Sequence, residues 1–354
     1  MSKLRIAVIG IGVIATTKHI PNLVKRDNVE IVALCDTDTS KCVKANEKFG
    51  LGAEIYTDYK ELCRRTDVDV VHICTPNPCH HPMTMAALNN GKHVHCEKPL
   101  ACTYTDAREM VDTAEEKGLK LTSGLQWRYN AAPLKMKAMI DNGELGDIYY
   151  VRSSQLRPRR LPAYGVYMNK ELNGGGVLMD GGPHSIDLPM WLLGNYDVAT
   201  VRGVTFDKMK DYPEGNSLGS WNPEEFDVED TAMAMITMKN GTMIYMETAW
   251  ITNMQQEAPG VIASLAGTKA GVDMVGPTFE CSVRTTKMVD GELKTDTENI
   301  AEPVDMNAYD IDHWIDAVQN DKDPAILPEQ AATVTRVIEA IYESAATGKT
   351  VVFD

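Results

Sequence analysis

A glycine-containing turn near the start of the chain constrains its fold more than any other feature. The apolar run Leu4–Ile9 leads directly into the segment GIGVIA, and a helical pattern follows. In this arrangement Gly10 permits a tight turn, and Gly12 lets the backbone approach a pyrophosphate. Ala15 is small enough for close strand–helix packing, and the helix N-terminus supplies free N–H groups and positive potential. The turn therefore predicts a Rossmann dinucleotide-binding domain.

The end of the next apolar run indicates which dinucleotide binds. Glu30–Cys35 is a second buried strand, and Asp36 follows it at the position that holds the ribose 2′-hydroxyl of a bound cofactor. A carboxylate there repels the 2′-phosphate of NADP, so NAD is the favoured cofactor. Lys41 lies close to Asp36 in the sequence, and for that reason NADP is kept as the alternative.

The hydrophobic pattern divides the chain, which at 354 residues is long for a single core, into two domains. In the first part, near-continuous apolar runs alternate with helical segments, which is typical of a parallel sheet covered on both faces. Later runs alternate apolar and polar residues, and Asn240-Gly241 separates two of them as a β-hairpin turn. We therefore expect an α/β Rossmann domain at 1–124 and an α+β domain with a large, mostly antiparallel open sheet at 125–354. Its expected strands are Ile148–Leu156, Ala199–Thr205, Thr231–Met238, Thr242–Trp250, Val261–Leu265 and Thr278–Val283.

Charge and hydropathy exclude several classes of partner. With 50 acidic against 35 basic residues, the net charge of -15 repels nucleic-acid phosphates and anionic lipid surfaces. No apolar run approaches the ~18–20 residues that a membrane span needs, and the N-terminal residues show no cleavable signal pattern. We therefore expect a cytoplasmic protein that binds neither nucleic acid nor membranes.

Two further segments follow buried strands, at the edge where open α/β sheets bind ligands. Thr75-Pro76-Asn77 follows the run Val68–Cys74, and Glu97-Lys98-Pro99 follows the run His93–Cys96. The prolines fix the direction of the chain as it leaves each strand. Adjacent opposite charges are usually a solvated ion pair, so the local sequence leaves the role of Glu97 and Lys98 open.

Histidines and cysteines are concentrated in the first domain, which raises the question of a metal site. Their spacing matches no zinc pattern, and they alternate along buried strands or open a helix. We therefore expect no metal, and we interpret His80 as part of a helix start near the nicotinamide. The residues concerned are His72, Cys74, Cys79, His80, His81, His93, His95 and Cys96.

Six motifs occur in a fixed order along the chain. They are GIGVIA from Gly10, CTPN from Cys74 with His80, EKPL from Glu97, QWRYN from Gln126, GGGVLMDGGPH from Gly174, and WLLG from Trp191. This set resembles the glucose–fructose oxidoreductase/inositol dehydrogenase (Gfo/Idh/MocA) family over nearly the whole chain. The resemblance implies an enzyme that oxidises or reduces secondary alcohols of sugars, inositols or related polyols with NAD or NADP.

The resemblance also implies roles for three residues. Lys98 matches the family's catalytic lysine, and Asp180 and His184 match its acid–base pair. Oxidising an alcohol removes a hydride from carbon and a proton from oxygen, and histidine is the side chain that titrates near neutral pH. His184 is then the base, Asp180 orients the imidazole or binds the substrate, and Lys98 polarises the reacting oxygen. Pro189 departs from the family pattern, and we expect it to kink the helix that His184 begins.

The expected site residues fall into two overlapping groups. One group is expected to bind the cofactor and the other the substrate. Arg128 and Tyr164 belong to the substrate-binding group because each can hydrogen-bond hydroxyls of a substrate. The expected cofactor-binding residues are Gly10, Gly12, Val13, Ile14, Asp36, Thr37, Thr75, Pro76, Asn77, His80, Glu97, Lys98 and Gln126. The expected substrate-binding residues are Lys98, Arg128, Tyr164, Asp180 and His184.

Three classes of function are compatible with these residues. The first is an NAD(P)-dependent dehydrogenase or reductase acting on a sugar, inositol or related polyol. The second is a glycoside-cleaving enzyme that oxidises a ring hydroxyl transiently with NAD. The third, a dinucleotide-binding regulator without turnover, is disfavoured because Lys98, Asp180 and His184 are all present. We also expect a homodimer or homotetramer, formed through an open sheet face that carries residues such as Met235 and Tyr245 together with Met243.

Overall fold

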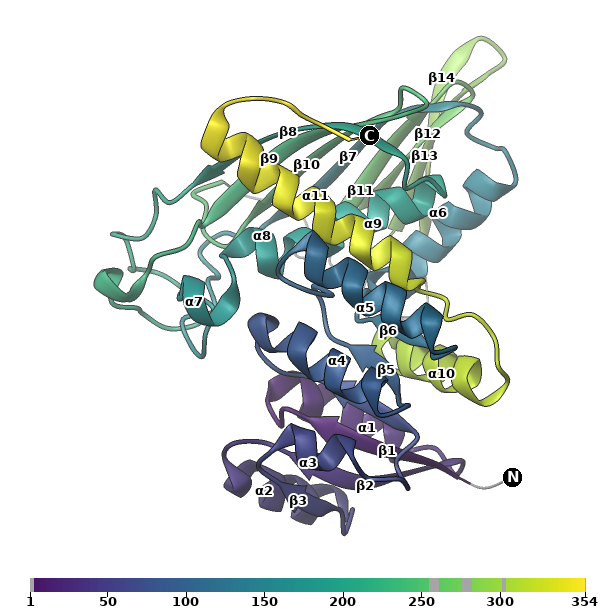
Figure 1. Cartoon of the computed structure of the whole chain (residues 1–354). Coiled ribbons are helices and arrows are strands. Elements are labelled where there is room, and N and C mark those ends of the chain that lie inside the picture. Colours follow the sequence, from purple (N-terminus) through teal and green to yellow (C-terminus); the bar gives the residue numbers. More distant parts are fainter. Residues whose placement is uncertain (1–2, 255–260, 276–281, 301–303, 354) are drawn as a thin grey trace. The chain divides into compact units, whose positions relative to one another are not determined.

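A computed structural model describes residues 3–254, 261–275, 282–300 and 304–353 of the chain. The chain forms two compact units, the first from residues 1–126 and 306–335 and the second from residues 127–305 and 336–354 (Figure 1). The division expected at residue 124 lies beside the first exchange between the units. The return of residues 306–335 to the first unit has no counterpart in the division drawn from the sequence.

The first unit contains a six-stranded sheet with the strand order of a Rossmann fold. The order is β3-β2-β1-β4-β5-β6, and every neighbouring pair is parallel, which confirms the predicted fold class of this part. The order reverses between β1 and β4, and ligands bind outside the carboxyl ends of the strands at such a point. The strands are β1 (Leu4–Ile9), β2 (Val29–Cys35), β3 (Glu54–Tyr56), β4 (Val70–Ile73), β5 (His93–Cys96) and β6 (Leu121–Ser123).

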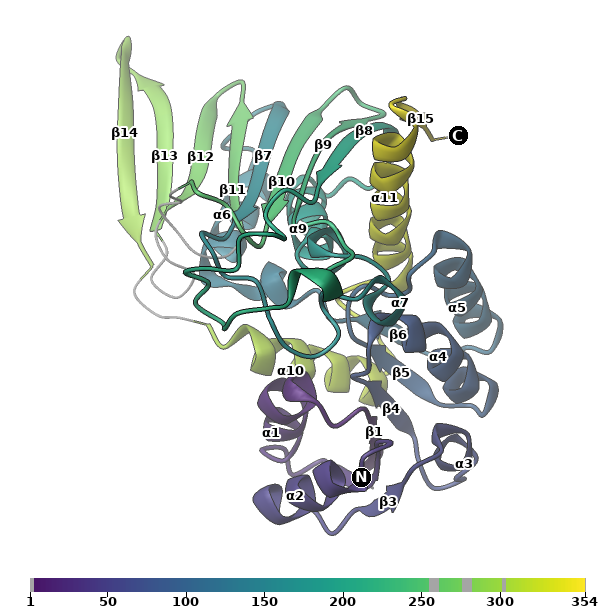
Figure 2. The ribbon, with the colours of Figure 1, turned by 90° about the vertical axis from the view of Figure 1, so that its left-hand side faces the viewer.

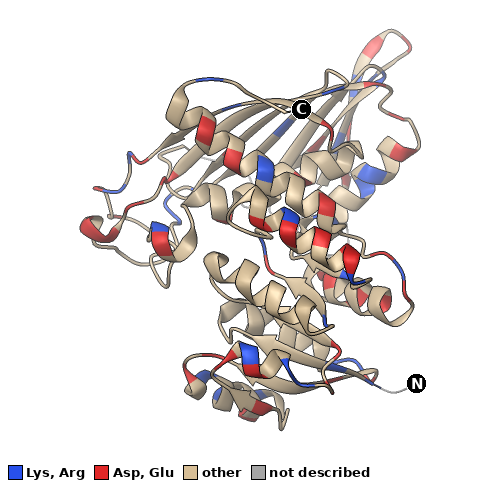
Figure 3. Ribbon diagram, in the orientation of Figure 1, with Lys and Arg blue, Asp and Glu red and all other residues tan. Residues whose placement is uncertain are grey.

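Helices cover both faces of this sheet (Figure 2). The core of one face joins the sheet to Ile311, Trp314 and Ile315 from the distant helix α10, whereas α4 packs on β4 and β5 from the other face. Most charged residues of α5 are Asp or Glu (Figure 3), in line with the net negative charge. The helices of the first face are η1 (Ala15–His19), α1 (Ile20–Leu23), α2 (Thr39–Phe49) and α10 (Met306–Gln319). Those of the other face are α3 (Tyr59–Cys63), α4 (His80–Asn89) and α5 (Tyr104–Glu116).

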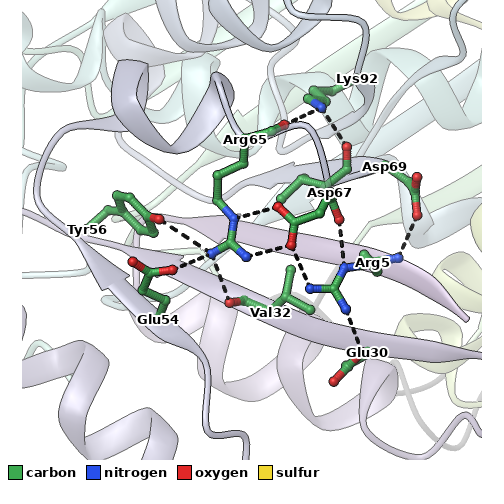
Figure 4. Close-up of polar contacts among 10 residues, drawn as sticks. Arg5, Glu30, Val32, Glu54, Tyr56, Arg65, Asp67, Asp69 and Lys92 are labelled. Atoms are coloured by element: carbon green, nitrogen blue, oxygen red, sulfur yellow. Dashed lines mark hydrogen bonds and ion pairs between the residues drawn. The ribbon is translucent and has the colours of Figure 1, made fainter.

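Charged side chains join the strands at the amino-terminal edge of this sheet (Figure 4). Arg5, near the start of β1, donates to Asp67 Oδ2 at 2.6 Å, and Arg65 donates to both oxygens of the same carboxylate at 2.9 and 2.7 Å. Hydrogen bonds from the two guanidinium groups lower the pKa of Asp67. The ammonium of Lys92 donates to the main-chain oxygens of Arg65 and Val68 at 2.6 and 2.7 Å. Because Arg5 lies near the start of the strand that ends before the glycine turn, this network lies at the edge opposite that turn.

The second unit is built on a nine-stranded sheet in the order β14-β13-β12-β11-β7-β10-β9-β8-β15. Among the described strands of this sheet, only β7 and β10 pair in parallel, which confirms a mostly antiparallel sheet. The hairpin expected at Asn240-Gly241 joins β9 to β10, and Gly241 has a φ of +89° that favours glycine. Of the expected strand Thr278–Val283, residues 278–281 lie outside the described residues. The strands are β7 (Ile148–Leu156), β8 (Val198–Phe206), β9 (Thr231–Met238), β10 (Met243–Ala249), β11 (Ile262–Gly267), β12 (Ala270–Val275), β13 (Ser282–Val289), β14 (Glu292–Asn299) and β15 (Val351–Val352).

Three helices cover one face of this sheet. α9 packs against β7 and β10, and α6 packs against β12 and β13. Ile341 of α11 lies so close to β8 that a Cβ on Gly203 would be 2.7 Å from its side chain. α9 continues through Pro189 to its end at Leu193. The helices are α6 (Ala131–Asp141), α9 (Gly182–Leu193) and α11 (Pro328–Thr347), with the short α7 (Lys170–Asn173) and α8 (Val177–Asp180) before α9.

The opposite face of the sheet carries larger exposed side chains. Met235 on β9 exposes 48% of its surface, and its neighbours Met233, Met243 and Tyr245 are half-buried. Among the described residues, no helix has both the length and the apolar character that crossing a membrane requires.

Candidate active site

The turn after β1 has the geometry that its two glycines predict. Gly10 has a φ of +85°, and a Cβ on it would lie 2.7 Å from the main-chain oxygen of Cys74. Glycine is therefore required there both by the backbone conformation and by the contact with the end of β4. Gly12 differs, because a Cβ on it would meet no described atom within 4 Å. The open space over Gly12 fits a pyrophosphate that approaches the backbone at the start of the following helix.

The carboxylate of Asp36 is bound to this turn. Its Oδ2 accepts a hydrogen bond from the main-chain N–H of Ile11 at 2.8 Å, and its Oδ1 accepts one from the N–H of Asp38 at 2.9 Å. Lys41 Nζ lies 3.4 Å from Oδ1. A carboxylate has about four lone-pair sites, so Asp36 retains acceptor capacity for a ribose hydroxyl. Of the other expected cofactor residues of this region, Val13, Ile14 and Thr37 follow the two strand ends, and Val13 and Thr37 are exposed.

His80 connects the segments that follow β4 and β5. Its buried ring places Nε2 at 2.9 Å from the main-chain oxygen of Thr75 and Nδ1 at 2.7 Å from that of Pro99. Burial lowers the pKa of His80, although the two carbonyl oxygens oppose the shift. The Thr75 hydroxyl is enclosed and has no hydrogen-bond partner among the described residues, which suits a group that meets a cofactor. Pro76 and Asn77 follow it, and Asn77 begins the short helix η2 (Asn77–Cys79).

Glu97 is buried, whereas most adjacent charges in proteins lie in solvent. Its Oε1 lies 2.8 Å from Lys18 Nζ, and its Oε2 accepts the main-chain N–H of Lys98 at 3.3 Å. Burial by itself would raise the pKa of Glu97, but Lys18 and His19 hold it well below its usual value. Gln126 Oε1 lies 3.4 Å from the same ammonium group. The structure thus brings the expected residues Glu97 and Gln126 together around a lysine that sequence analysis did not identify, and Glu97 also accepts the N–H of Lys98.

Three buried histidines of the first unit lie close enough to raise the question of a metal again. The ring centroids of His19, His72 and His95 are 4.9–5.1 Å apart. The Nδ1 atoms of His19 and His72 are 2.8 Å apart, which is a hydrogen-bond distance. Two nitrogens bound to one tetrahedral zinc at about 2.0–2.1 Å would be about 3.3 Å apart. The distance therefore favours a hydrogen-bonded pair over shared metal ligands.

Asp180 and His184 lie on consecutive helices of the second unit. Asp180 ends α8, and His184 lies in the first turn of α9. Asp180 Oδ2 accepts a hydrogen bond from Trp250 Nε1 at 2.8 Å and lies 3.5 Å from the guanidinium of Arg157. His184 is 6% exposed, and its ring centroid is 5.9 Å from that of Trp127. The carboxylate is therefore oriented by two donors, and the imidazole packs beside an aromatic ring.

Glu229 holds the glycine-rich segment that leads to Asp180. It accepts hydrogen bonds from the main-chain N–H groups of Gly176 and Leu178 at 3.0 and 2.9 Å, and Tyr342 Oη donates to it at 2.8 Å. Burial raises the pKa of Glu229, although these donors oppose the shift. A Cβ on Gly176 would lie 2.0 Å from the main-chain oxygen of Glu229. Glycine at this position lets Glu229 cap α8, and the cap fixes the helix that Asp180 ends.

Arg128 is buried and binds side chains of its own unit. It is 1% exposed, and it donates from Nε to Asp187 Oδ2 at 2.7 Å and from a terminal nitrogen to Asp187 Oδ1 at 2.5 Å. Tyr196 Oη completes the group, accepting from Arg128 at 2.8 Å and donating to Asp187 at 2.9 Å. Asp187 lies one turn after His184 on α9. This geometry favours a structural role for Arg128 over the substrate contact expected from the sequence.

Tyr164 begins a chain of aromatic rings that ends beside Asp180. Its ring lies edge-to-face with Tyr167 at 5.8 Å, and Tyr167 lies edge-to-face with Trp250 at 6.2 Å. Tyr164 is 51% exposed, whereas Trp250 is fully buried. The chain therefore runs from the surface to the indole that donates to Asp180. An exposed aromatic ring in this position can pack against the apolar face of a sugar ring.

Sequence analysis did not predict the contacts that hold the expected residues in place. Trp250 and Arg157, which directly follow β10 and β7, meet Asp180, and no spacing in the sequence indicates these contacts. Lys18 carried a usable signal, because a charge inside the apolar start of the first helix is unusual unless it is paired. Its partner Asp310 lies so far along the chain that only the fold reveals the pair.

Comparisons with known proteins agree with this architecture. A family model described as the NAD-binding Rossmann fold of the GFO_IDH_MocA oxidoreductase family matches residues 4–125, and the C-terminal alpha/beta domain of the same family matches residues 137–353. The D-glucoside 3-dehydrogenase of Escherichia coli K12 is 33% identical over 347 residues, which cover 98% of this chain and 97% of that protein. The inositol 2-dehydrogenase of Salmonella typhimurium LT2 is 32% identical over 201 residues, 56% of this chain and 57% of that protein.

Solved structures share the fold over the full length. An aldose-aldose oxidoreductase from Caulobacter crescentus, complexed with glycerol, has a TM-score of 0.83 at 26% identity and covers 99% of this chain and 100% of its own. A levoglucosan dehydrogenase in complex with NADH and levoglucosan has a TM-score of 0.85 at 21% identity, with 99% of each chain covered. The chain belongs to the Gfo/Idh/MocA family of NAD-binding oxidoreductases.

Proposed function

We propose that the protein is an NAD-dependent dehydrogenase that oxidises a secondary ring hydroxyl of a sugar, with a glucoside as the first candidate substrate. The observation that carries the proposal is the fixed carboxylate of Asp180 directly before the helix whose first turn holds His184. The Escherichia coli relative, similar over almost the whole chain, is named for a glucoside, and the Salmonella relative is named for inositol. Both names describe cyclic molecules that present secondary hydroxyls.

The proposed roles of the residues follow from the chemistry of alcohol oxidation. The carbon loses a hydride while the hydroxyl proton goes to His184, which later releases it to solvent, and Asp180 stabilises the imidazolium. The ammonium of Lys98 stabilises the charge that develops on the oxygen as the ketone forms. Bound NAD supplies the hydride acceptor. Gly12 and Asp36 would hold it, because Gly12 leaves open space beside the backbone and Asp36 retains hydrogen-bond acceptor capacity. In this proposal Tyr164 contacts the sugar ring.

A substrate panel tests the proposal. Purified protein is incubated with NAD and alkyl or aryl glucosides, free glucose, inositols and linear polyols, and absorbance of the reduced nicotinamide is followed. We expect stoichiometric NADH with at least one cyclic substrate and a ketone product by mass spectrometry. Cleavage of the glycoside without net NADH would instead identify the transient-oxidation alternative. Binding of NAD without turnover of any panel member would contradict the dehydrogenase proposal.

The same panel, run with both cofactors, tests the role of Asp36. We expect NAD to bind about tenfold or more tightly than NADP, because the carboxylate repels a 2′-phosphate. Asp36→Ser should narrow this preference, since serine retains a hydrogen-bonding group without the charge. Asp38→Ser is the matched control, because Asp38 caps α2 through Ser40 N–H and serine is an equally good cap. Equal binding of both cofactors by the wild type would overturn the assignment.

We also propose that copies of the chain associate through the open face of the nine-stranded sheet, as a homodimer or a homotetramer. The exposed Met235 and its half-buried neighbours support this choice. Light scattering at micromolar concentration should give a mass of at least twice the 39.1 kDa of one chain. Met235→Lys should shift the protein towards monomer, whereas Val43→Lys, at an exposed position on α2, should leave the mass unchanged. A monomeric wild type would refute the proposed interface.

A further inference from the structure

The first unit contains a fully buried lysine that the proposed chemistry does not use directly. Lys18 lies on η1, just after the glycine turn, and no part of its surface is exposed. Its ammonium lies 2.8 Å from Glu97 Oε1 and 3.0 Å from Asp310 Oδ2, and both carboxylates are also buried. Burial alone would lower the pKa of Lys18, but Asp310 and Glu97 outweigh it and raise the pKa. Lys18 is therefore a permanent cation between two carboxylates.

Three buried histidines complete this network. Burial lowers the pKa of His19 to about 4 and that of His72 well below its usual value. His19 Nε2 lies 2.9 Å from Glu97 Oε1, so its single proton is placed to donate there, and His72 Nδ1 then donates to His19 Nδ1 at 2.8 Å. His95 Nε2 lies 3.1 Å from Asp310 Oδ2 on the other side. Each carboxylate thus receives one histidine N–H and the shared ammonium.

The network meets the proposed site at Glu97. The second oxygen of this carboxylate accepts the main-chain N–H of Lys98 at 3.3 Å. On its remaining side Glu97 touches Gly124, where an added Cβ would lie 2.6 Å from Oε2. The carboxylate is therefore fixed from several directions, and one of its bonds fixes the backbone that carries Lys98.

Stability alone gives a poor reason for this arrangement. Replacing a buried ion pair or triad by apolar residues of similar volume is often neutral or stabilising, so such groups contribute little net stability. A fixed carboxylate beside Lys98 can instead contribute to the reaction rate, because a misplacement of about 1 Å at a reacting group can reduce the rate by about 10²-fold. The buried group of Lys18, Glu97 and Asp310 lies next to Lys98. Its position therefore indicates that it serves to position Lys98.

We propose that Lys18 and Asp310 are positioning residues for the oxidation reaction: they hold Glu97 in place, and Glu97 holds the backbone of Lys98. The proposal rests on the proposed function, in which Lys98 stabilises the charge on the substrate oxygen. Lys18 holds Glu97 directly, and Asp310 acts through Lys18, so changes at the two residues should differ in size.

The test compares Lys18→Met and Asp310→Asn with the wild type. For Lys18→Met we expect kcat to fall by about 10–100-fold, while the affinity for NADH, measured by fluorescence, changes little. Asp310→Asn should have a smaller effect, because Lys18 and His19 still hold Glu97. Lys92→Met is the matched control, since Lys92 is also buried but binds main-chain oxygens at the opposite edge of the sheet (Figure 4). It should lower the unfolding temperature while leaving kcat of the folded enzyme unchanged.

Hydrogen exchange of the Lys98 amide gives a readout that does not depend on turnover. Mass spectrometry of a peptide that contains Lys98 should show exchange about tenfold faster in Lys18→Met, because opening of the bond to Glu97 becomes easier. If that variant does not fold, Glu97→Gln provides the same comparison with little change in shape. Unchanged exchange at Lys98, or equal losses of kcat in Lys18→Met and Lys92→Met, would overturn the inference. A wild type without turnover on any panel substrate would contradict the proposed function, and exchange would still decide whether the network positions Lys98.

Discussion

Replacing His184 by alanine should lower kcat by about 10²–10⁴-fold, the usual contribution of a positioned acid–base group. Affinity for NAD should be nearly unchanged, because the glycine turn belongs to the other unit of the chain. The wild-type rate should rise from acid to neutral pH as imidazole loses its proton, and this rise should be absent in the variant. His81→Ala is the control, since His81 lies at the surface of α4 and pairs with Glu109. Steady-state kinetics with the substrate found in the panel measures all three effects.

Changes at Lys98 separate charge stabilisation from proton transfer. Lys98→Ala should be about as damaging as His184→Ala, because it removes an interaction felt mostly in the transition state. Lys98→Arg should restore little activity, since a planar guanidinium does not replace a compact ammonium. Near-normal turnover by His184→Ala would show that another group is the base, and Lys98 would then be the first residue to examine.

Replacing Arg128 by methionine should lower the free energy of unfolding by about 3–5 kcal/mol, because it leaves the carboxylate of Asp187 buried without its cation. Denaturant unfolding of the wild type and the variant measures the difference. The double variant Arg128→Met/Asp187→Leu should regain much of the loss, because no uncompensated charge remains.

An exposed pair provides the control for this experiment. Arg108 and Asp112 are one turn apart on the surface of α5, and breaking such a pair changes stability by about 0.3–0.5 kcal/mol. Arg108→Ala should therefore unfold at nearly the wild-type denaturant concentration. If Arg128→Met were no less stable than Arg108→Ala, the buried pair would not hold α9 in place.

The elements that the sequence predicts well are those whose apolar pattern is strong. The strands β1 and β2 are nearly continuous apolar runs, and β9 and β10 alternate around an Asn-Gly turn. Their existence and type are confirmed. The strand β14, with the sequence ELKTDTEN, has every residue exposed and carries no apolar face to recognise. An Asp-Gly turn at residues 290–291 connects it to β13, and the two strands pair along their length. Main-chain pairing rather than burial therefore defines β14.

The candidate site divides in the same way. Motif positions were predictable because each chemical group has a local signature, as Gly10 and the Glu-Lys-Pro segment do. The contacts that orient those groups were not predictable. Trp250, 70 residues later in the chain, donates to Asp180, and Asp310 is separated from Lys18 by most of the chain. Arg128 illustrates the opposite difficulty, because an arginine beside a motif has the same sequence signature whether it binds a ligand or a buried aspartate.

The return of residues 306–335 to the first unit has a consequence for biosynthesis. Residues 1–126 leave the ribosome early, but the core that they share with Ile311, Trp314 and Ile315 is complete only after residues 127–305 have been made. At about 5–20 residues per second this interval lasts on the order of 10–40 s. During that time an apolar sheet face lacks one of its covering helices, α10, and Lys18 has only one of its two carboxylates. The nascent chain is therefore a natural client for chaperones that bind exposed apolar surface while translation proceeds.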